Sequence, residues 1–548
     1  MSELQGTGSA CRVVGEARIR ALFLTLNARP AMITRRSPIA NYPSIVAVIA
    51  ALAVGSGGLG AQDAMRAFEY DYVAEAAIAA GIDVDNPDPA QLRDVFAKRR
   101  ARIIAAMPDG AMITFSVERA QERRLEFQVP HSDNHDFTYL TGLDGIDALD
   151  SALVLVPSPG PQISEQEVPD VPWAVLYTSG DPGTIAGRTG IADVRPFDEL
   201  EKDLSVAMTD YRDWRVTQVR RWPLAAALSK RWGPDRKILY LNYPRFFRLG
   251  MPEPVRLETF ARIQRFSPEI VVRDSADILD IVRMYHDSWS LANLRRAIDI
   301  TSEGVIEALR VARVGLTEKQ VMEAMDFVYR YRGATLGFPT SVRRQFFGGE
   351  VVTREVPEGW IEFVPRSGGA VFEAGDLLHT DTGAAFNHYS ADIQRNIPID
   401  GVFTDEQREL YTIALDVQKA VIEAIRPGVT WWELHEIAVR MLRDAGGYDE
   451  HYTYGIGHFI GMEVHDEGDY LRSLEAGMML SIEQGVAPPE GPRVAFEDDV
   501  LVTEDGYEWL SRVIPIEIEE IEELASQPSA LQGFIDKTPF DGLLRIPR

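Results

Sequence analysis

Four carboxylates and one histidine between Asp381 and Glu497 constrain this chain more than any other feature. They are Asp381, Asp392, His458, Glu483 and Glu497. Each lies in a short segment that is either strand-like in composition or rich in glycine. Carboxylates combined with one imidazole suit hard or borderline divalent ions such as Mn²⁺, whereas a structural zinc site is commonly built on cysteine.

The first pair carries the sharpest physical signal. The stretch LLHTDTGAAFNHYSADIQRNIPI consists of two apolar, β-prone runs that meet at a polar turn around Phe386 and Asn387. A hairpin centred there places Asp381 directly opposite Asp392, with their Cβ atoms roughly 5 Å apart. Two carboxylates at that distance repel, and one must be protonated unless a cation lies between them. The pattern therefore predicts a metal site.

The other three residues extend the prediction to a dinuclear site. Glu483 ends the apolar run MMLSIE, Glu497 interrupts the strand-like run RVAFEDDVLVT, and His458 lies between glycines in YGIGHFIGMEVHD. An exposed carboxylate on an edge strand is the competing interpretation of Glu497. Four carboxylates and a neutral histidine balance two divalent cations, and such a pair of ions makes a bridging water nucleophilic.

These residues carry a family resemblance over roughly the C-terminal half. Their order and their settings in HTDTG, SADIQR, GIGHFIGMEVHD, SIEQG and FEDDV resemble the aminopeptidase P and prolidase branch of the pita-bread, M24-type metallopeptidases, which includes the Xaa-Pro aminopeptidases. The resemblance implies two divalent ions, Mn²⁺ first, with Zn²⁺ or Co²⁺ as alternatives. It implies that Asp381 binds one metal, that Asp392 and Glu497 bridge, and that His458 and Glu483 complete the second.

The resemblance also implies catalytic roles for two residues. Glu483 accepts the proton of the attacking water, and His465, seven positions after His458, stabilises the tetrahedral intermediate. Tyr454 stands where many relatives have a histidine, which makes it a candidate substrate-binding residue. Ala495 stands where an arginine is common, and Arg493 is a possible substitute.

A further departure concerns a histidine that relatives carry before the first metal-binding aspartate. No histidine occurs between His286 and His379. Arg343 and Arg344 lie in this interval, where they are either a solvated charge pair or a binding site for a peptide carboxylate. The departure leaves the predicted ligands untouched and weakens the expectation of a strict proline preference.

Composition excludes several other classes of function. The chain has 548 residues and a net charge of −27. So large a negative charge argues against binding to nucleic acid or to an anionic membrane. The single cysteine, Cys11, excludes an intramolecular disulfide framework and a cysteine-based zinc site.

The first residues have the pattern of an export signal. Arg35 and Arg36 precede the apolar run SIVAVIAALAV, and small residues suited to cleavage follow up to Ala61. The apolar run is too short for a stable membrane span. We expect an exported protein, periplasmic or secreted, with Met32 as the natural start and residues 1–31 as an over-extended reading frame. The alternative is a buried N-terminal helix in a cytoplasmic protein.

The whole chain is expected to be of the α/β (α+β) class. We expect the over-extended start and export signal over residues 1–61, a leader segment over 62–93 and a C-terminal tail over 516–548. Alternating helical and strand-like patterns predict an α/β domain over 94–280, which the resemblance identifies as a smaller, creatinase/aminopeptidase P-like N-terminal domain. The pita-bread metallopeptidase domain is expected over 281–515.

The function expected from this reading is that of a metal-dependent exopeptidase. It releases the N-terminal residue of peptides whose second residue is proline, and the resemblance implies a homo-oligomer, dimer or tetramer. Two alternatives within the family remain open, a prolidase-type dipeptidase and a peptidase without proline preference. A non-catalytic binding protein on a peptidase scaffold is the alternative from a different class.

Overall fold

The computed structural model describes residues 70–107, 110–116, 134–157, 173–208, 224, 237–242, 255–268, 270–345, 369–452, 455–486, 488 and 493–531. Residues 59–548 form one compact unit. The predicted export signal, Tyr454 and the last part of the predicted tail lie outside the described residues. The predicted domain boundaries stay predictions.

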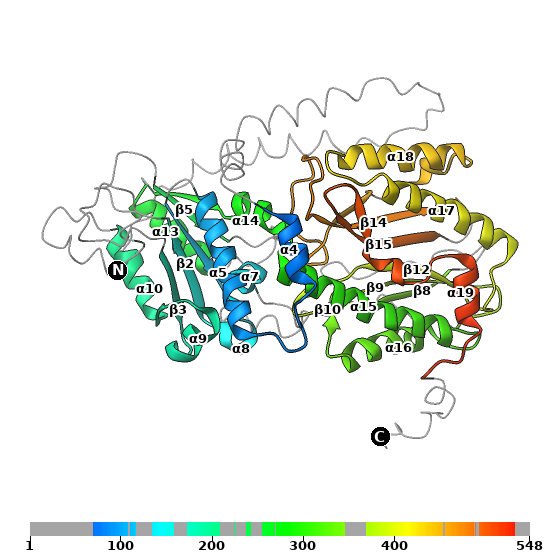
Figure 1. Ribbon diagram of the computed structural model, residues 1–548, viewed down its shortest axis with the longest axis horizontal. Helices are drawn as coiled ribbons and strands as arrows, with labels where there is room; N and C mark the ends of the chain where they lie inside the picture. The colour runs from blue at the N-terminus through cyan, green and yellow to red at the C-terminus, as the bar shows by residue number, and fades with distance from the viewer. Residues whose placement is uncertain are drawn as a thin grey trace, which may run out of the picture. The chain divides into compact units, whose positions relative to one another are not determined.

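The first half of the described chain is built on one mixed sheet (Figure 1). Its described strands follow the order β4-β3-β2-β1-β5-β6. They are β1 (Ala111–Phe115), β2 (Ser151–Val156), β3 (Trp173–Thr178), β4 (Asp193–Pro196), β5 (Lys237–Leu241) and β6 (Ile270–Asp274). Strand β1 pairs antiparallel with β2 and parallel with β5, and β2 pairs antiparallel with β3.

Helices cover both faces of this sheet. Among the described residues of this half, the helices are α4 (Tyr72–Ala79), α5 (Pro89–Ala106), α7 (His135–Thr141), α8 (Gly145–Ala148), α9 (Pro182–Thr189), α10 (Asp198–Met208), α13 (Val255–Phe266) and α14 (Ala276–Arg283). Met112 and Leu153 join a core with residues of α5, α7 and α9. Ile113 and Val154, which alternate with them, join a second core with residues of α10 and α13. Period-two alternation in fully buried strands thus produces a three-layer α/β arrangement.

A second, antiparallel sheet organises the second half. Its described strands follow the order β13-β14-β15-β12-β9-β8, with β16 paired to β15. They are β8 (Ser341–Gln345), β9 (Leu377–Thr382), β12 (Ile393–Pro398), β13 (Gly457–Phe459), β14 (Met479–Val486), β15 (Val494–Val502) and β16 (Tyr507–Trp509). A small neighbouring sheet contains β7 (Thr335–Leu336), β10 (Ala384–Phe386) and β11 (Tyr389–Ser390).

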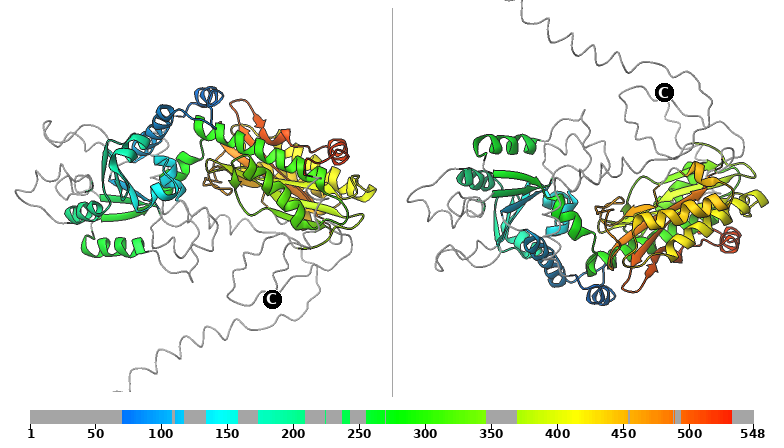
Figure 2. Two further views of the ribbon diagram at one scale, coloured as in Figure 1. Left: turned by 90° about the horizontal axis from the view of Figure 1, so that it is seen from below. Right: turned by 90° about the horizontal axis from the view of Figure 1, so that it is seen from above.

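Helices pack on one face of this second sheet, and Figure 2 shows them in green and yellow along its strands. They include α15 (Ser288–Val311), α16 (Glu318–Tyr331), α17 (Asp405–Glu423) and α18 (Trp431–Asp444), while η2 (Tyr448–His451), η3 (Leu510–Val513) and α19 (Ile518–Ala525) follow later in the chain. Gln418 of α17 donates to the Ile482 carbonyl at 2.7 Å, and the Tyr329 hydroxyl of α16 lies 3.0 Å from Thr382 Oγ1. The two helices therefore contact the same face, and the opposite face carries the predicted metal ligands.

Threonine residues define the starts of three of these helices. Helices α16, α17 and α18 begin after Thr317, Thr404 and Thr430, each of which forms a capping box with the residue three positions later. This reciprocal hydrogen bonding satisfies backbone N–H groups that have no partner within the helix. The segment Arg426-Pro427-Gly428 separates α17 from α18, because proline and glycine do not continue a helix.

The predicted register of the Asp381–Asp392 hairpin was wrong by two residues. The turn is at Asn387 and His388, with φ values of 46° and 72°, and Phe386 pairs with Tyr389. Such left-handed pairs form type I′ turns, which match the twist of the flanking strands, and asparagine tolerates them. Asp381 therefore faces Gln394 instead of Asp392. Because the shift is an even number of residues, Asp392 stays on the same face as Asp381.

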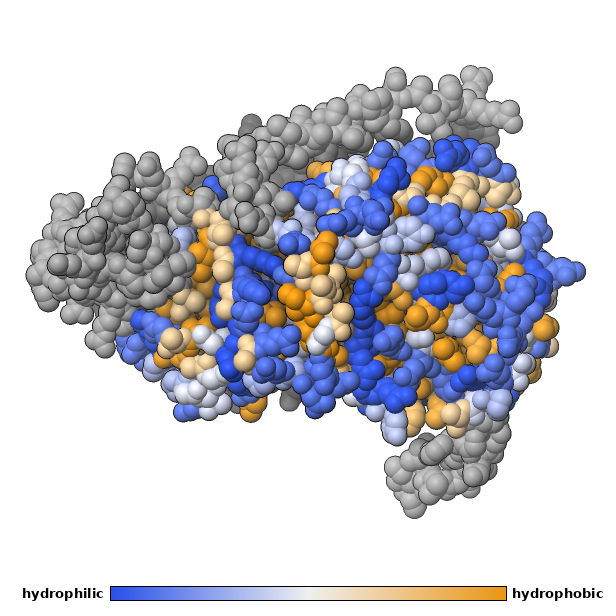
Figure 3. Space-filling model, viewed as in Figure 1, coloured by the Kyte–Doolittle hydropathy of each residue, from blue (hydrophilic) through white to orange (hydrophobic). Residues whose placement is uncertain are grey.

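The surface of the described residues is mixed in character. On the face shown in Figure 3, apolar residues lie interspersed among hydrophilic ones. Among the helices that the structure describes, none combines the length and the apolar character that a membrane crossing requires.

A buried ion pair joins helix α5 to the start of α15. Arg99 is 1% exposed and binds both carboxylate oxygens of Asp287, at 2.6 and 2.8 Å. The same guanidinium donates to the Tyr389 hydroxyl at 2.8 Å. Burial alone would raise the pKa of Asp287, but the adjacent guanidinium holds it well below its ordinary value. Arg99 thus connects the first half of the described chain to the hairpin that precedes Asp392.

We expect Asp287→Ala to destabilise the protein by about 3–5 kcal/mol, because it leaves the Arg99 charge buried without its carboxylate. Urea denaturation measures this loss. Asp94→Ala is the control, because Asp94 pairs with Lys98 on the exposed surface of the same helix α5, where an ion pair contributes at most ~1 kcal/mol. Equal effects of the two substitutions would contradict the prediction.

Candidate metal centre

Register across the second sheet places three predicted ligands in one row. Asp381 of β9 faces Gln394 of β12, Gln394 faces Glu497 of β15, and Glu497 faces Glu483 of β14. Residues paired directly across strands point to the same face with Cβ atoms roughly 5 Å apart. The row therefore carries three carboxylates with an amide between two of them.

A second row on the same face supplies the other two ligands. His458 of β13 faces Ser481, and Ser481 faces Asp499. The Asp392 backbone N–H donates to Asp499 Oδ2 at 3.2 Å. Asp392 lies two residues before Gln394, so its side chain lies on the face of the first row.

The five predicted ligands meet in overlapping groups. Three sets each bring their ligand atoms within 4.8 Å of one another: Asp381 with Asp392 and Glu497, His458 with Glu483 and Glu497, and Asp392 with His458 and His465. His458 Nε2 lies 3.4 Å from Asp392 Oδ2 and 3.3 Å from Glu497 Oε1. His465 is exposed, and its ring lies edge-on to that of His458 at 4.2 Å between centroids. The structure thus brings together residues that are up to 116 positions apart in the sequence.

Burial and mutual repulsion shift the pKa values of these groups. Burial and the Glu497 carboxylate raise the pKa of Asp392 well above its ordinary value. The same two causes raise the pKa of Glu483 from 4.5 to about 7. Burial opposes ionisation of Glu497 as well, but hydrogen bonds led by His458 lower its pKa. Burial opposes a charge on His458, but the carboxylates of Asp392 and Glu497 raise its pKa well above 6.5.

The side chains fit divalent cations. Asp392 Oδ1 is buried and makes no hydrogen bond to any described residue. A buried carboxylate oxygen without a partner costs free energy that a coordinated ion recovers. Four carboxylates and one imidazole are donors suited to Mn²⁺-like ions, and their charge balances two such ions. Asp381, Asp392, His458, Glu483 and Glu497 are the residues that would hold them.

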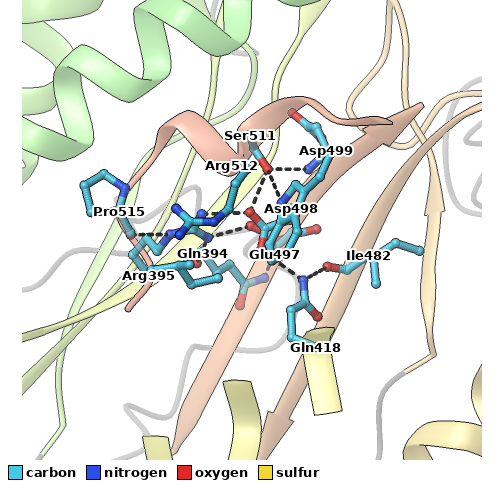
Figure 4. Close-up of polar contacts among 12 residues, drawn as sticks. Gln394, Arg395, Gln418, Ile482, Glu497, Asp498, Asp499, Ser511, Arg512 and Pro515 are labelled. Atoms are coloured by element: carbon cyan, nitrogen blue, oxygen red, sulfur yellow. Dashed lines mark hydrogen bonds and ion pairs between the residues drawn. The ribbon is translucent and has the colours of Figure 1, made fainter. Parts of the chain in front are cut away.

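A buried arginine on the helix-covered face supports the strand that carries Glu497, and Figure 4 shows its contacts. Arg395 is fully buried and binds Asp498 at 2.7 Å, while it also donates to the Glu497 carbonyl at 3.0 Å. Ser511 and Gln418 complete the hydrogen bonds of Asp498 at 2.6 and 3.1 Å. These contacts lie on the helix-covered face and fix the backbone that positions Glu497. Sequence reasoning did not identify them, although alternation in FEDDV places Asp498 opposite to Glu497.

A second buried arginine holds the loop that carries His465. Arg283 of α14 bonds to Asp136 of α7 at 2.7 Å and to Asp466, the residue after His465. Asp466 also accepts from the Met462 N–H at 2.9 Å. The position of His465 therefore depends on contacts with the first half of the chain. No local sequence signal pairs Arg283 with residues 147 and 183 positions away.

The remaining candidates have distinct surroundings. Tyr454 lies outside the described residues. His379 lies on the ligand-bearing face, where its Nδ1 contacts Asn396 Oδ1 at 3.3 Å, and burial together with Arg493 lowers its pKa to about 4. Arg343 and Arg344 have different surroundings. Arg344 binds Asp376 at 2.6 Å, whereas Arg343 is exposed.

Comparison with known proteins agrees with this geometry. Residues 292–504 match the model of metallopeptidase family M24. The Xaa-Pro dipeptidase of Pyrococcus furiosus is 28% identical over 262 residues, which cover 46% of this chain and 71% of that protein. Xaa-Pro aminopeptidase 2 of Streptomyces coelicolor is 32% identical over 282 residues, which cover 45% of this chain and 57% of that protein. The chain thus spans 57% to 71% of the length of these relatives.

A solved structure is similar over a longer part of the chain. Aminopeptidase P from Escherichia coli, determined with the inhibitor Pro-Leu, aligns with a TM-score of 0.60 at 21% identity. The alignment covers 79% of this chain and 98% of that one. It therefore includes both sheets.

Residues 292–504 thus have the sequence pattern of a metallopeptidase domain of family M24, a pattern shared with hydrolases. This region lies in the aminopeptidase P and prolidase branch of that family. The expected fold class, a pita-bread domain preceded by a smaller α/β domain, is confirmed.

The raised pKa of Glu483 predicts how stability depends on pH in the metal-free protein. Between pH 4.5 and about 7 the folded protein binds more protons at Glu483 than the unfolded protein does. The free energy of unfolding therefore falls as pH rises through this window. We expect a loss on the order of a few kcal/mol in chelator-treated protein, measured by urea denaturation at each pH and reversed by Mn²⁺.

Glu483→Gln removes this titrating group, so we expect it to flatten the pH dependence. Glu423→Gln, on the exposed surface of α17, is the control and leaves the wild-type profile. If Glu483→Gln and wild type lost stability equally between pH 5 and 7, the prediction would be wrong.

Proposed function

We propose that the protein is a metal-dependent exopeptidase that releases the N-terminal residue from peptides with proline in second position. One observation carries the proposal: five side chains suited to binding divalent ions meet on one sheet face within the region that matches metallopeptidase family M24. The names of its relatives, Xaa-Pro dipeptidase and Xaa-Pro aminopeptidase, support the proline preference.

Hydrolysis of the peptide bond requires a polarised carbonyl with an activated water, a group that transfers the proton, and stabilisation of the negative charge that develops on oxygen. Two divalent ions held by the five donors would polarise the scissile carbonyl and acidify the attacking water. The Glu483 carboxylate accepts the proton of that water and returns it to the leaving nitrogen, since a prolyl nitrogen carries no hydrogen of its own. His465, exposed beside His458, donates a hydrogen bond to the oxygen on which charge develops.

Other parts of the proposal rest on sequence and resemblance. Mn²⁺ is the preferred ion, with Zn²⁺ or Co²⁺ as alternatives, because hard oxygen ligands outnumber the single imidazole. The predicted export signal, which follows the over-extended start and ends near residue 61, supports a periplasmic or secreted mature enzyme. A homo-oligomer, dimer or tetramer, completes the proposal.

The test is product analysis of an Xaa-Pro-Yaa tripeptide with protein starting near residue 62 and loaded with Mn²⁺. We expect release of the free first residue, and a chelator should abolish it. Asp392→Asn should remove tight binding of one ion and reduce turnover by at least ~100-fold, because that carboxylate contacts the centre directly. Asp444→Asn at the exposed end of α18 is the control. Full activity with one ion per chain would exclude the dinuclear mechanism.

Arg343 favours a second candidate, a dipeptidase of prolidase type. It faces His379, while Ser341, two residues earlier, faces Asp381. Its side chain therefore lies on the ligand-bearing face, with its Cα roughly 8 Å from that of Asp381. The side chain of Arg343 makes no hydrogen bond or ion pair with another described residue, whereas Arg344 is held by Asp376 and Glu373 at 2.6 and 3.1 Å. In an Xaa-Pro dipeptide the free carboxylate directly follows the proline, within reach of such a guanidinium.

Arg343→Gln tests this candidate. If Arg343 binds the carboxylate, KM for an Xaa-Pro dipeptide should rise about 10-fold or more, the loss of a charge-assisted hydrogen bond of ~1.5–3 kcal/mol. KM for the C-terminal amide of the same dipeptide should stay unchanged. Arg440→Gln, on the exposed surface of α18, is the control. An equal change for acid and amide would rule out recognition of the carboxylate by Arg343.

A further inference from the structure

Gln394 lies in the middle of the ligand row, although neither its residue type nor its motif suggested a role. On β12 it is paired with Asp381 on one side and with Glu497 on the other. Its side chain is 6% exposed and shares the face of those two carboxylates. An uncharged amide is thus inserted between two candidate metal ligands.

The two ends of this amide are used differently. Its Nε2 donates to Glu497 Oε2. Its Oε1 is buried and accepts no hydrogen bond from any residue that the structure describes. A buried amide oxygen without a partner costs about 1–3 kcal/mol. The opposite orientation of the amide would point its oxygen at the Glu497 carboxylate, so the network assigns the nitrogen to Glu497.

Amide geometry indicates where the oxygen points. The nitrogen and oxygen diverge from one planar carbon, so an amide whose nitrogen contacts Glu497 of β15 directs its oxygen away from that carboxylate, and β9 is the strand on the other side of β12. Asp381 is the residue that β9 places there. An amide oxygen beside carboxylates is a set of donors that Mn²⁺-like cations accept, because these ions bind carbonyl and carboxylate oxygens alike.

We propose that Gln394 Oε1 is a sixth protein ligand of the metal centre, and that it binds the ion shared by Asp381, Asp392 and Glu497. The inference rests on the proposed function only in requiring that the centre hold divalent ions. A neutral ligand adds a donor without disturbing the balance between four carboxylates and two dications. Metal binding by this amide also explains why an uncharged side chain lies between two carboxylates of the ligand row.

The test measures metal binding to the full chain with Co²⁺ as the probe, using stoichiometry, affinity by calorimetry, and the visible absorption that reports coordination. In Gln394→Leu we expect a loss of affinity for one ion of at least ~10-fold, together with a changed Co²⁺ spectrum. Gln394→Glu keeps an oxygen at the same distance from the backbone, so it should still bind two ions per chain, with a Co²⁺ spectrum that differs from that of Gln394→Leu. Thermal unfolding of the metal-free variants verifies that they fold.

Gln407→Leu is the matched control. Gln407 is also a buried amide, but it lies in the first turn of α17, where its hydrogen bonds join it to Thr404 and to the Gly375 carbonyl. We expect this variant to bind both ions as wild type does.

Several outcomes decide the question. An unchanged Co²⁺ spectrum in Gln394→Leu overturns the proposal, with or without a loss of affinity, because the amide then acts only by orienting Glu497. A wild-type chain that binds no divalent ion overturns it as well. A chain that binds two ions and cleaves no peptide overturns the proposed function alone, and the spectra still decide the role of Gln394.

Discussion

Four carboxylates that repel one another lie on one face of a single sheet, and the second half of the molecule holds them there. Burial alone would drive several of them to the protonated form, as the raised pKa values of Asp392 and Glu483 show. His458 offsets part of the repulsion by contacting Asp392 and Glu497 together. The repulsion that remains explains why divalent cations fit the site and why the free energy of unfolding is expected to depend on pH.

Strand β15 shows how the fold holds these mutually repelling carboxylates in place. Glu497 and Asp499 face the ligand-bearing side, while Asp498 between them points to the helices and meets Arg395. Gln418 and Ser511 complete the hydrogen bonding of Asp498. The Arg395–Asp498 ion pair on the helix-covered face thus fixes the backbone of the neighbouring Glu497, whose carboxylate lies among the charged groups of the opposite face.

Much of this arrangement was predictable from sequence, for identifiable reasons. The order and spacing of Asp381, Asp392, His458, Glu483 and Glu497 led to the site, because carboxylates in strand-like runs have few structural explanations. Alternating helical and strand-like patterns predicted the α/β character of the first half. The hairpin register was missed because a left-handed Asn387-His388 turn has no strong signal without glycine. Gln394 was missed because its relevance depends on which residues lie across the sheet, which local sequence does not show.

The contact between Arg99 and Tyr389 bears on whether the peptidase domain can stand alone. Tyr389 lies directly after the hairpin turn, three residues before Asp392, and its hydroxyl receives a hydrogen bond from a helix of the first half. A fragment that began at Asp287, the residue before α15, would keep Asp287 and Tyr389 and lose the guanidinium that both of them bind. The first half of this chain is therefore part of the scaffold of the hairpin that carries Asp381 and Asp392, and a substitution at Arg99 acts on both halves of the chain.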